Sequence, residues 1–507
     1  MVSGGQMLRR WCLYLLVFSS FAVWNRTASA ESSAVQPKQK NASAKLPVTT
    51  SLPVTTSSKE ARNSFEKANR EFEEYRIPET LQDLRAAAKA DPNFAQAFIL
   101  ISRLSQDPGE QAATRKHAMQ LAVKASAGEQ LLIRWLADAQ ENNYLPAIAA
   151  MNDLLAKYPR DQRLAYLAGD WLMQQQRYEQ AVTVLERALA LNPNYAAALN
   201  DVAYGYADLG NFDKAFAAME RYVALEPDQP NPHDSYGEIL RMAGKPDAAL
   251  EQYRMSIRID PNFGSEVGIA DTYALMGKEL EAREEYDRAI VFAPSNADKV
   301  QRELQSAVTW IRENNRKQAE RALNDVARHA HSAGLARLEA ETHRILGMYE
   351  PDPKTAMKQL QAAQDVLGEE HEISASDRDE ELARILRVRA TRLTEVGDMD
   401  SASKAVNQLE AMADTSRSQV IQLCYHGAAG AVLVAQGKFA EAVPHLEEGM
   451  SDPESMRLLW RAYTSTGATS EAQAIASKLA SLNLPTVEQA LVVPQFRVSL
   501  ISRAEQP

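Results

Sequence analysis

From about residue 61 onward, apolar residues recur every three or four positions within short stretches that polar residues interrupt. This spacing places the apolar side chains on one face of an α-helix. Residues 162–193 illustrate the pattern, because two apolar stretches flank a polar break at 174–177. The apolar positions are Leu164, Leu167, Ala168 and Leu172, then Tyr178, Ala181, Val184, Leu185 and Ala188. A proline follows the second stretch and ends it. The pattern predicts pairs of short antiparallel helices.

Prolines mark a fixed period for these pairs. Pro159, Pro193, Pro227 and Pro261 follow one another at equal intervals, and Pro294 follows at an interval one position shorter. A period of about 34 residues is typical of a repeat array, in which each unit packs on its neighbours. We count about seven units in residues 59–296, of which the last five are regular and the first two degenerate.

Small residues at fixed places in each unit resemble the tetratricopeptide repeat. Gly169, Ala181, Ala188 and Pro193 occupy the places where that motif has a small residue, two alanines and a proline. The next two units keep the pattern in part, with Ala203, Ala215 and Pro227, and then with Gly237, Ala249 and Pro261. Bulk at such places would push neighbouring helices apart. The resemblance implies an all-α fold, a right-handed superhelix (solenoid) of stacked antiparallel helix–turn–helix repeats.

Beyond Pro294 the proline marker stops, but turn-like segments continue to separate apolar stretches. We therefore predict about five divergent, repeat-like hairpins with longer helices in residues 297–484. The polar stretch 368–380 is expected to be a loop that ends in a helix cap at Ser376 or Asp377.

Residues 485–507 are expected to form a C-terminal cap or tail. Pro494 interrupts this segment, and Phe496, Val498 and Leu500 alternate as they would in an extended strand. We favour a segment that folds back over the last hairpin, because repeat arrays need covered ends. A docking peptide is the alternative.

The N-terminus has the pattern of a secretory signal peptide at residues 1–30. Arg9 and Arg10 precede the apolar stretch 11–24, and an Ala-Ser-Ala cleavage site follows at 28–30. An anchor that stays uncleaved is the alternative. The pattern predicts export to the periplasm, or another space outside the cytoplasm of a bacterium, with no membrane insertion after cleavage.

Residues 31–58 are rich in Ser, Thr and Pro, and they contain Leu-Pro-Val-Thr-Thr-Ser twice in tandem, at 46–51 and 52–57. Such a segment has too little apolar surface to order itself. We expect a disordered linker between the signal peptide and the array.

The charge of the chain excludes one class of partner. The formal net charge is −11, and the signal-like segment holds three arginines and no acid, so the chain without it carries −11 − 3 = −14. Nucleic-acid binding requires a basic face, so we expect no nucleic-acid partner.

No motif predicts catalysis, a cofactor or a metal. His371 and Glu372 begin an H-E-x-x-H pattern, but position 375 is alanine. His329 and His331 are two residues apart on a predicted helix and therefore point in different directions. Signal cleavage would leave Cys424 as the only cysteine, in an apolar stretch that predicts a buried thiol.

The first helix of each tetratricopeptide unit lines a concave face that binds protein or peptide partners, and the resemblance implies the same groove here. The matching positions in three successive units are Arg163, Tyr166, Asp170, Asn200, Tyr204, Asp234, Glu238 and Arg241. Acidic residues prevail among them, so we expect a partner segment of basic or amide-rich character. Tyr166 and Tyr204 are either anchors for a partner or packing between adjacent helices.

These observations predict a non-catalytic scaffold for protein–protein interactions in the cell envelope, as a subunit of an assembly, secretion or export complex. Repeats are shared across unrelated functions, so two alternatives stay open. One is a regulatory or sensory extracytoplasmic module of a signalling system. The other is an enzyme with its site in residues 300–480, which would need a deep pocket with converging titratable groups.

Overall fold

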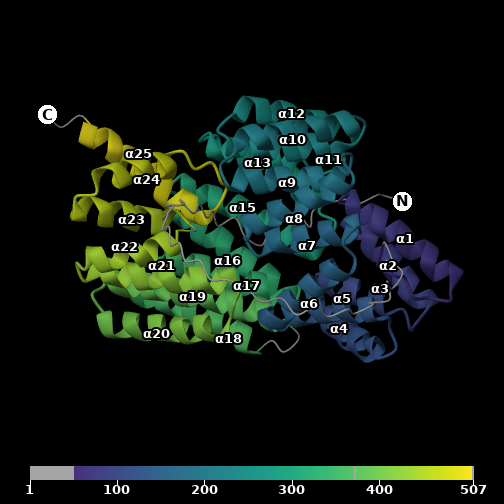
Figure 1. Cartoon of the computed structure of the whole chain (residues 1–507). Coiled ribbons are helices and arrows are strands. Elements are labelled where there is room, and N and C mark those ends of the chain that lie inside the picture. Colours follow the sequence, from purple (N-terminus) through teal and green to yellow (C-terminus); the bar gives the residue numbers. More distant parts are fainter. Residues whose placement is uncertain (1–50, 370–372, 451, 505–507) are drawn as a thin grey trace, which may run out of the picture.

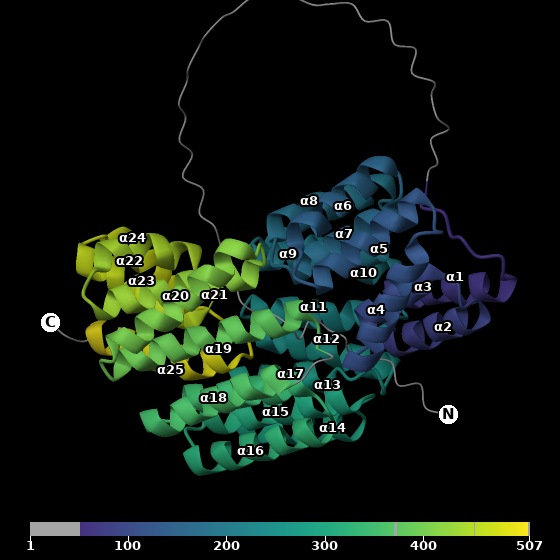
Figure 2. The ribbon, with the colours of Figure 1, turned by 90° about the horizontal axis from the view of Figure 1, so that it is seen from below.

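The computed structural model describes residues 51–369, 373–450 and 452–504, and every regular element in these ranges is an α-helix. The signal-like segment and most of the linker, residues 1–50, lie outside the described residues, as does the His371-Glu372 pair. Figures 1 and 2 show helices stacked side by side in antiparallel pairs along a curved path. The all-α solenoid predicted from the sequence is confirmed.

Seven helix pairs lie between Lys59 and Val291. They are α1 (Lys59–Glu73), α2 (Ile77–Ala90), α3 (Ala95–Leu104), α4 (Pro108–Ala122), α5 (Ala127–Gln140), α6 (Tyr144–Lys157), α7 (Gln162–Gln174), α8 (Tyr178–Leu191), α9 (Ala196–Asp208), α10 (Phe212–Leu225), α11 (Pro230–Met242), α12 (Pro246–Ile259), α13 (Glu266–Leu275) and α14 (Glu279–Val291). We call this part the regular half.

Five further pairs and a last helix make up the part that we call the divergent half. They are α15 (Asn296–Arg312), α16 (Arg316–Ser332), α17 (Ala336–Tyr349), α18 (Pro353–Glu369), α19 (Ala375–Glu395), α20 (Met399–Thr415), α21 (Gln419–Ala435), α22 (Phe439–Glu448), α23 (Pro453–Thr466), α24 (Thr469–Ala480) and α25 (Val487–Ala504). Several of these helices are 17 residues long, whereas α7 to α12 have 13 or 14.

Local sequence explains where many hairpins turn. Gly210 and Gly244 adopt left-handed φ values of 75° and 72° directly after α9 and α11, a conformation that glycine reaches without a Cβ penalty. Ser126 and Glu129 form a reciprocal capping box at the start of α5. These turns follow the predicted pattern.

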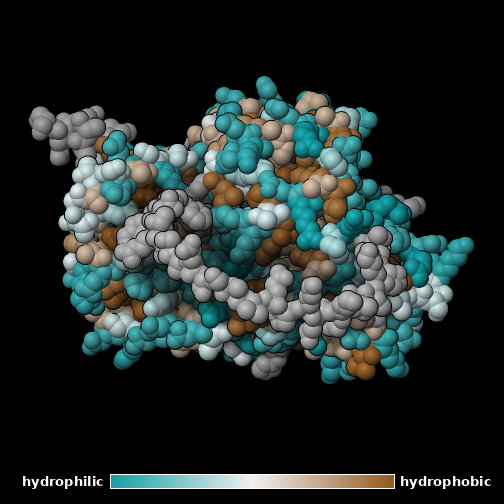
Figure 3. All heavy atoms as spheres, in the orientation of Figure 1, coloured by the Kyte–Doolittle hydropathy of each residue, from teal (hydrophilic) through white to brown (hydrophobic). Residues whose placement is uncertain are grey.

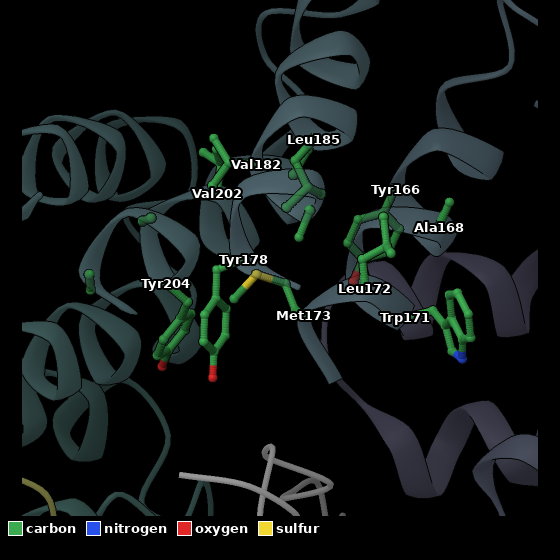
Figure 4. Packing of buried hydrophobic residues seen from close by; sticks show 14 of the residues in the cluster. Tyr166, Ala168, Trp171, Leu172, Met173, Tyr178, Val182, Leu185, Val202 and Tyr204 are labelled. Atoms are coloured by element: carbon green, nitrogen blue, oxygen red, sulfur yellow. The ribbon is translucent and has the colours of Figure 1, made fainter. Parts of the chain in front are cut away.

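Small residues let the paired helices approach closely. A Cβ built on Gly169 in α7 would lie 2.5 Å from Cγ of Leu185 in α8, well inside van der Waals contact. Ala181 and Ala188 of α8 are fully buried. Figure 4 shows the surrounding side chains of α7, α8 and α9 packed together, among them Leu185 and Leu172. The repeat signature is therefore a packing requirement.

The two halves also touch directly. The Asn142 amide, in the turn before α6, donates to Asp379 of α19 at 2.8 Å, and Tyr144 Oη donates to Glu380 at 2.9 Å. Helix α19 also packs against α5. The curved path thus brings helices that are far apart in the sequence into contact.

Three expectations about local structure were wrong. The cap of α19 is Ser374, whose hydroxyl accepts from the Asp377 amide at 3.1 Å, and not Ser376 or Asp377. Residues 492–501 are helical and belong to α25, with Pro494 inside the helix. The end of the expected disordered linker, from Leu52 to Ser58, has no regular secondary structure but is hydrogen bonded to the array, because Asp161 and the buried Glu129 accept from its polar groups.

Candidate functional site

A central cavity of about 430 Å³ lies on the concave side of the regular half. The first helices of successive pairs, from α3 to α19, supply its walls. Six of the eight predicted groove residues line it, namely Tyr166, Asp170, Asn200, Tyr204, Glu238 and Arg241. Figure 3 shows one face of the molecule, where the surface is hollowed near its centre.

Most of the predicted groove residues are buried rather than open to a partner. Tyr166, Asn200, Tyr204 and Arg241 are between 2% and 4% exposed, and Asp234 is fully buried. Asp234 is not among the residues that line the cavity, and neither is Arg163. The predicted side chains therefore converge on the concave face, as parts of its packing.

Contacts within the chain satisfy several of these side chains. Arg103 of α3 forms an ion pair with Asp170, and Tyr204 Oη donates to Glu238 at 2.8 Å. Arg241 donates to the second Glu238 oxygen at 3.1 Å. The acidic character that the sequence suggested is thus largely compensated by neighbouring donors.

The first hairpin of the chain covers one side of this concave face. Arg163 of α7 binds Glu66 at 3.0 Å and Glu73 at 2.8 Å, both on α1. Tyr75, in the turn after α1, donates through Oη to Asp201 of α9 at 2.6 Å. The repeat period gives no signal for this contact, because it joins residues 126 positions apart in the sequence.

One carboxyl of the cavity has a markedly altered proton affinity. Burial raises the pKa of Asp271 to about 6, against the opposing influence of Arg241 and a hydrogen bond from Tyr286. Asn200, which also lines the cavity, keeps a buried Oδ1 without a hydrogen-bond partner in the described residues.

A larger cavity of about 700 Å³, which we call the C-terminal groove, lies in the divergent half. Helices α15, α17, α19, α23 and α25 form its walls. Its apolar lining includes Leu304, Val308, Ile345, Met348, Val388, Trp460, Leu491, Val492 and Phe496. Gln301 and Arg337 line both cavities, so the two adjoin at α15 and α17. None of these residues was predicted as a site, since no consensus position marks them.

Six arginines and six carboxylates also line the C-terminal groove, and they are paired. The arginines are Arg337, Arg344, Arg384, Arg387, Arg392 and Arg457, and the acids are Glu341, Glu381, Glu395, Asp452, Glu454 and Glu488. Each acid has an arginine nitrogen within ion-pair distance. Arg387 and Asp452, at 2.5 Å, link α19 to α23. The groove is therefore rich in charge without a clear excess of either sign.

Helix α25 forms one wall of this groove. Its buried positions Val487, Ala490, Val493 and Phe496 recur every three residues, so one face of the helix is apolar. The Phe496 ring meets Trp460 of α23 edge-on, with centroids 5.1 Å apart. The predicted alternation in an extended strand is wrong, and Val498 points outward with 63% exposure.

The remaining candidates for chemistry do not form a site. Cys424 is buried in the core, and burial raises the pKa of its thiol to about 11. His329 lies near Glu303, and His331 near Glu339, both on the surface of α16. Within the described ranges, no three His, Cys, Asp or Glu side chains are arranged to hold a metal ion. No described helix has the length and apolar character to span a membrane.

Comparisons with known proteins agree with the repeat pattern. Two family models, both described as tetratricopeptide repeat, match residues 136–196 and 168–234. Cellulose synthase operon protein C of Xanthomonas axonopodis pv. citri is 29% identical over 157 residues, which are 29% of this chain. The match spans only 10% of that protein's length.

Solved structures with similar shape include yeast Tom70, with a TM-score of 0.41 and 15% identity over 82% of this chain and 96% of Tom70. A second is the Cut9–Hcn1 complex of the APC/C, with a TM-score of 0.39, 16% identity, and coverage of 79% and 76%. The family models, the phase of the small residues and the stacked helix pairs lead to one conclusion. The chain contains tetratricopeptide repeats over residues 136–234.

Proposed function

We propose that this protein is a non-catalytic scaffold in a bacterial cell envelope, and that its C-terminal groove binds a helical segment of a protein partner. Repeats of this family bind protein partners in a groove, which supports the general role. One observation supports the choice of groove: its wall already includes an amphipathic helix of the chain itself, α25, which packs against α15 and α23. A surface that accepts one amphipathic helix has the form needed for helix-in-groove recognition.

The chemistry of the groove indicates what such a partner helix carries. Apolar side chains such as Met348 and Val388 call for an apolar stripe with residues three and four positions apart. Glu488 of α25 lies 3.8 Å from Arg344, which shows how a helix carboxylate joins the ion pairs of the wall. A partner helix with one apolar face and a flanking acid fits both features.

The central cavity is a second, weaker candidate. Its acidic side chains support the basic or amide-rich peptide expected from the sequence, with Asp170, Glu238, Tyr166 and Tyr204 as contacts. Arg103 already pairs with Asp170. A peptide at this site would have to displace that arginine.

The location and the type of complex rest on other observations. The signal-like pattern of residues 1–30 supports export. The relative from Xanthomonas belongs by name to a cellulose synthase operon. A role in an assembly or export complex of the envelope is consistent with both, and it requires direct capture of the partner.

In-cell photo-crosslinking tests the proposal. A photoreactive amino acid replaces Val388, in the groove, or Met119, which is 51% exposed on α4 far along the chain. We expect a specific envelope protein to be captured from position 388 and not from 119. Capture of the same proteins from both positions would exclude the groove, and capture of cytoplasmic proteins alone would exclude the envelope role.

The C-terminal groove is large enough for the active site that the enzyme alternative requires. Its lining residues therefore decide whether it could be catalytic. Each lining acid is paired with an arginine, and among the described residues the lining contains no cysteine, histidine, lysine or tyrosine. A general base or nucleophile needs a reactive group that is not tied up in this way. The pairing supports a binding surface over a catalytic one.

A further inference from the structure

The strongest unassigned feature is the extended segment that precedes α1. Residues 52–57 lie across the N-terminal ends of α7, α5 and α3. We call the surface beneath them the strap groove, formed by Asp91, Gln96, Gly128, Glu129 and Asp161. It lies outside both cavities described above.

Hydrogen bonds hold Leu52, Pro53 and Thr55 of this segment in place. Leu52 donates its backbone N–H to Asp161 Oδ2 at 2.8 Å, and the Gln96 amide donates to the Pro53 carbonyl at 2.6 Å. Thr55 donates its N–H to Glu129 Oε1 at 3.0 Å and its hydroxyl to Oε2 at 2.6 Å. The strap groove thus forms hydrogen bonds with the backbone of the segment and with one side-chain hydroxyl.

Glu129 is the centre of the strap groove. Its side chain is buried, and burial opposes its charge, but hydrogen bonds from Ser126, Thr55 and Gln96 outweigh burial and lower its pKa. A buried carboxylate with these donors in place is costly to leave unsatisfied. The groove is therefore built to hold a hydroxyl-bearing, extended segment.

The apolar side chains of the segment also have shaped contacts. A Cβ on Gly128 would lie 2.7 Å from Cδ1 of Leu52 and 2.4 Å from the Tyr158 hydroxyl. The missing side chain therefore makes room for Leu52. Val54 packs beside the cluster that contains Phe65 and Ala61.

The sequence contains this ligand twice. Residues 46–51 repeat Leu-Pro-Val-Thr-Thr-Ser in the same order as residues 52–57. Each group that the strap groove contacts, from the leucine N–H to the second threonine hydroxyl, has its equivalent six residues earlier.

We propose that the strap groove is a peptide-binding site for Leu-Pro-Val-Thr-Thr-Ser, and that either copy of this sequence occupies it. The observed register uses the second copy. In the alternative register the first copy binds, and residues 52–57 form a loop between the groove and α1. The chain upstream then shifts by six residues, about 20 Å of extended backbone.

The observed register has an advantage at its end. Ser58 donates its N–H to the Thr56 hydroxyl, and its own hydroxyl accepts from Ala61 to cap α1. In the alternative register Leu52 takes the position that Ser58 has here. The residue after the bound copy then has no hydroxyl to cap α1, so one residue no longer joins the bound segment to the helix. The second copy is therefore the preferred occupant of the strap groove, and the first copy binds there when the second cannot.

Matched proline substitutions in the full chain test the exchange. Thr55→Pro removes the N–H and the hydroxyl that bind Glu129, and Thr49→Pro makes the same change in the first copy. We expect no change in melting temperature for T49P, a fall of about 2 °C for T55P, and a clearly larger fall for the double variant. Equal falls for T55P and T49P/T55P would refute the proposal, because the first copy would then offer no rescue.

A disulfide trap reports the register directly, with Cys12 changed to serine. Thr56→Cys with Asp91→Cys should crosslink within the chain, since the native hydroxyl and carboxylate are in hydrogen-bond contact. Thr50→Cys with Asp91→Cys should crosslink within the chain when Thr55→Pro is also present. Absence of that crosslink, or its formation only between two chains, would overturn the exchange within one chain.

Discussion

Each of the two cavities is bordered by one end of the folded chain, but the contacts at the two ends differ in kind. The hairpin of α1 covers one side of the central cavity, where Tyr75 donates to Asp201, whereas α25 forms one wall of a groove lined by arginine–carboxylate pairs. Tyrosine can hold a carboxyl in either protonation state, but an arginine holds it only as an anion. The regular half thus holds some of its carboxyls by tyrosines beside ion pairs such as Arg103–Asp170, whereas every acid that lines the C-terminal groove is paired with an arginine.

Helix length accompanies this difference. A helix of 17 residues, such as α15, spans about 26 Å, while the 13 residues of α9 span about 20 Å. Three of the five helices that line the C-terminal groove, α15, α19 and α25, have 17 to 21 residues, and the divergent half has the larger cavity. Loss of the strict period therefore goes with longer helices around a larger cavity.

Arg387→Met should have the largest effect, because it breaks the ionic network of the divergent half. Asp452 is 1% exposed and would lose its partner at 2.5 Å. Removing one member of a buried pair typically costs about 3–5 kcal/mol. Chemical denaturation monitored by circular dichroism measures the loss.

The double variant R387M/D452N is the matched control, since asparagine removes the stranded charge and keeps an oxygen to cap α23. We expect it to recover part of the lost stability. Arg328→Ala, which removes an exposed pair with Asp325, should cost under about 1 kcal/mol. An R387M variant as stable as R328A would contradict the ionic description of the groove.

Asp271→Asn tests a tyrosine–carboxyl contact of the regular half, in which Tyr286 donates to Asp271. The pKa of Asp271 in the folded protein, about 6, lies above its ordinary value of 3.8, so the folded state binds its proton more tightly. This contribution to stability is complete below pH 4 and is lost as the pH rises through 6. The loss amounts to about 3 kcal/mol at neutral pH.

The comparison of D271N with the unchanged protein isolates this group from other titrating residues. We expect the variant to be more stable at pH 7 and equally stable near pH 4, as measured by urea denaturation across this range. A stability difference that does not vary with pH would show that Asp271 is charged throughout, as in the divergent half.

Gly169→Ala and Gly430→Ala compare the packing unit of the two halves at one equivalent position. In both, a Cβ would lie 2.5 Å from a leucine of the paired helix, Leu185 or Leu446. Overpacking costs about 1–3 kcal/mol, and the better helix propensity of alanine returns about 1 kcal/mol. We expect both variants to lose up to about 2 kcal/mol in thermal denaturation. A clear loss in only one would show that the halves pack differently.

These positions also show why part of the fold was predictable. Helix pairs, turn glycines and small residues follow from spacing within one repeat unit, which a single sequence displays. The α25 helix had a visible signal as well, in the three-residue spacing of Val487, Ala490 and Val493, but Pro494 and a short alternation masked it.

The candidate site was less predictable for a physical reason. The predicted groove residues converge on the concave face, but the sequence does not reveal that α1 folds back onto α7 and α9. Such contacts depend on the superhelical curvature, which sums small rotations over many repeats. The same holds for Arg387 and Asp452, which lie in different hairpins and share no motif.

Arg163→Gln is the change with the smallest expected effect, and it addresses the covering of the central cavity. The arginine side chain is 42% exposed and binds Glu66 and Glu73 on α1. Exposed pairs of this kind contribute about 0.2–1 kcal/mol. We expect unchanged global stability within error, and faster hydrogen exchange confined to α1 and the neighbouring turn, as resolved by mass spectrometry. Exchange that also quickens in α25 would mean that the two ends of the chain are coupled, and the regular and divergent halves would then act as one unit.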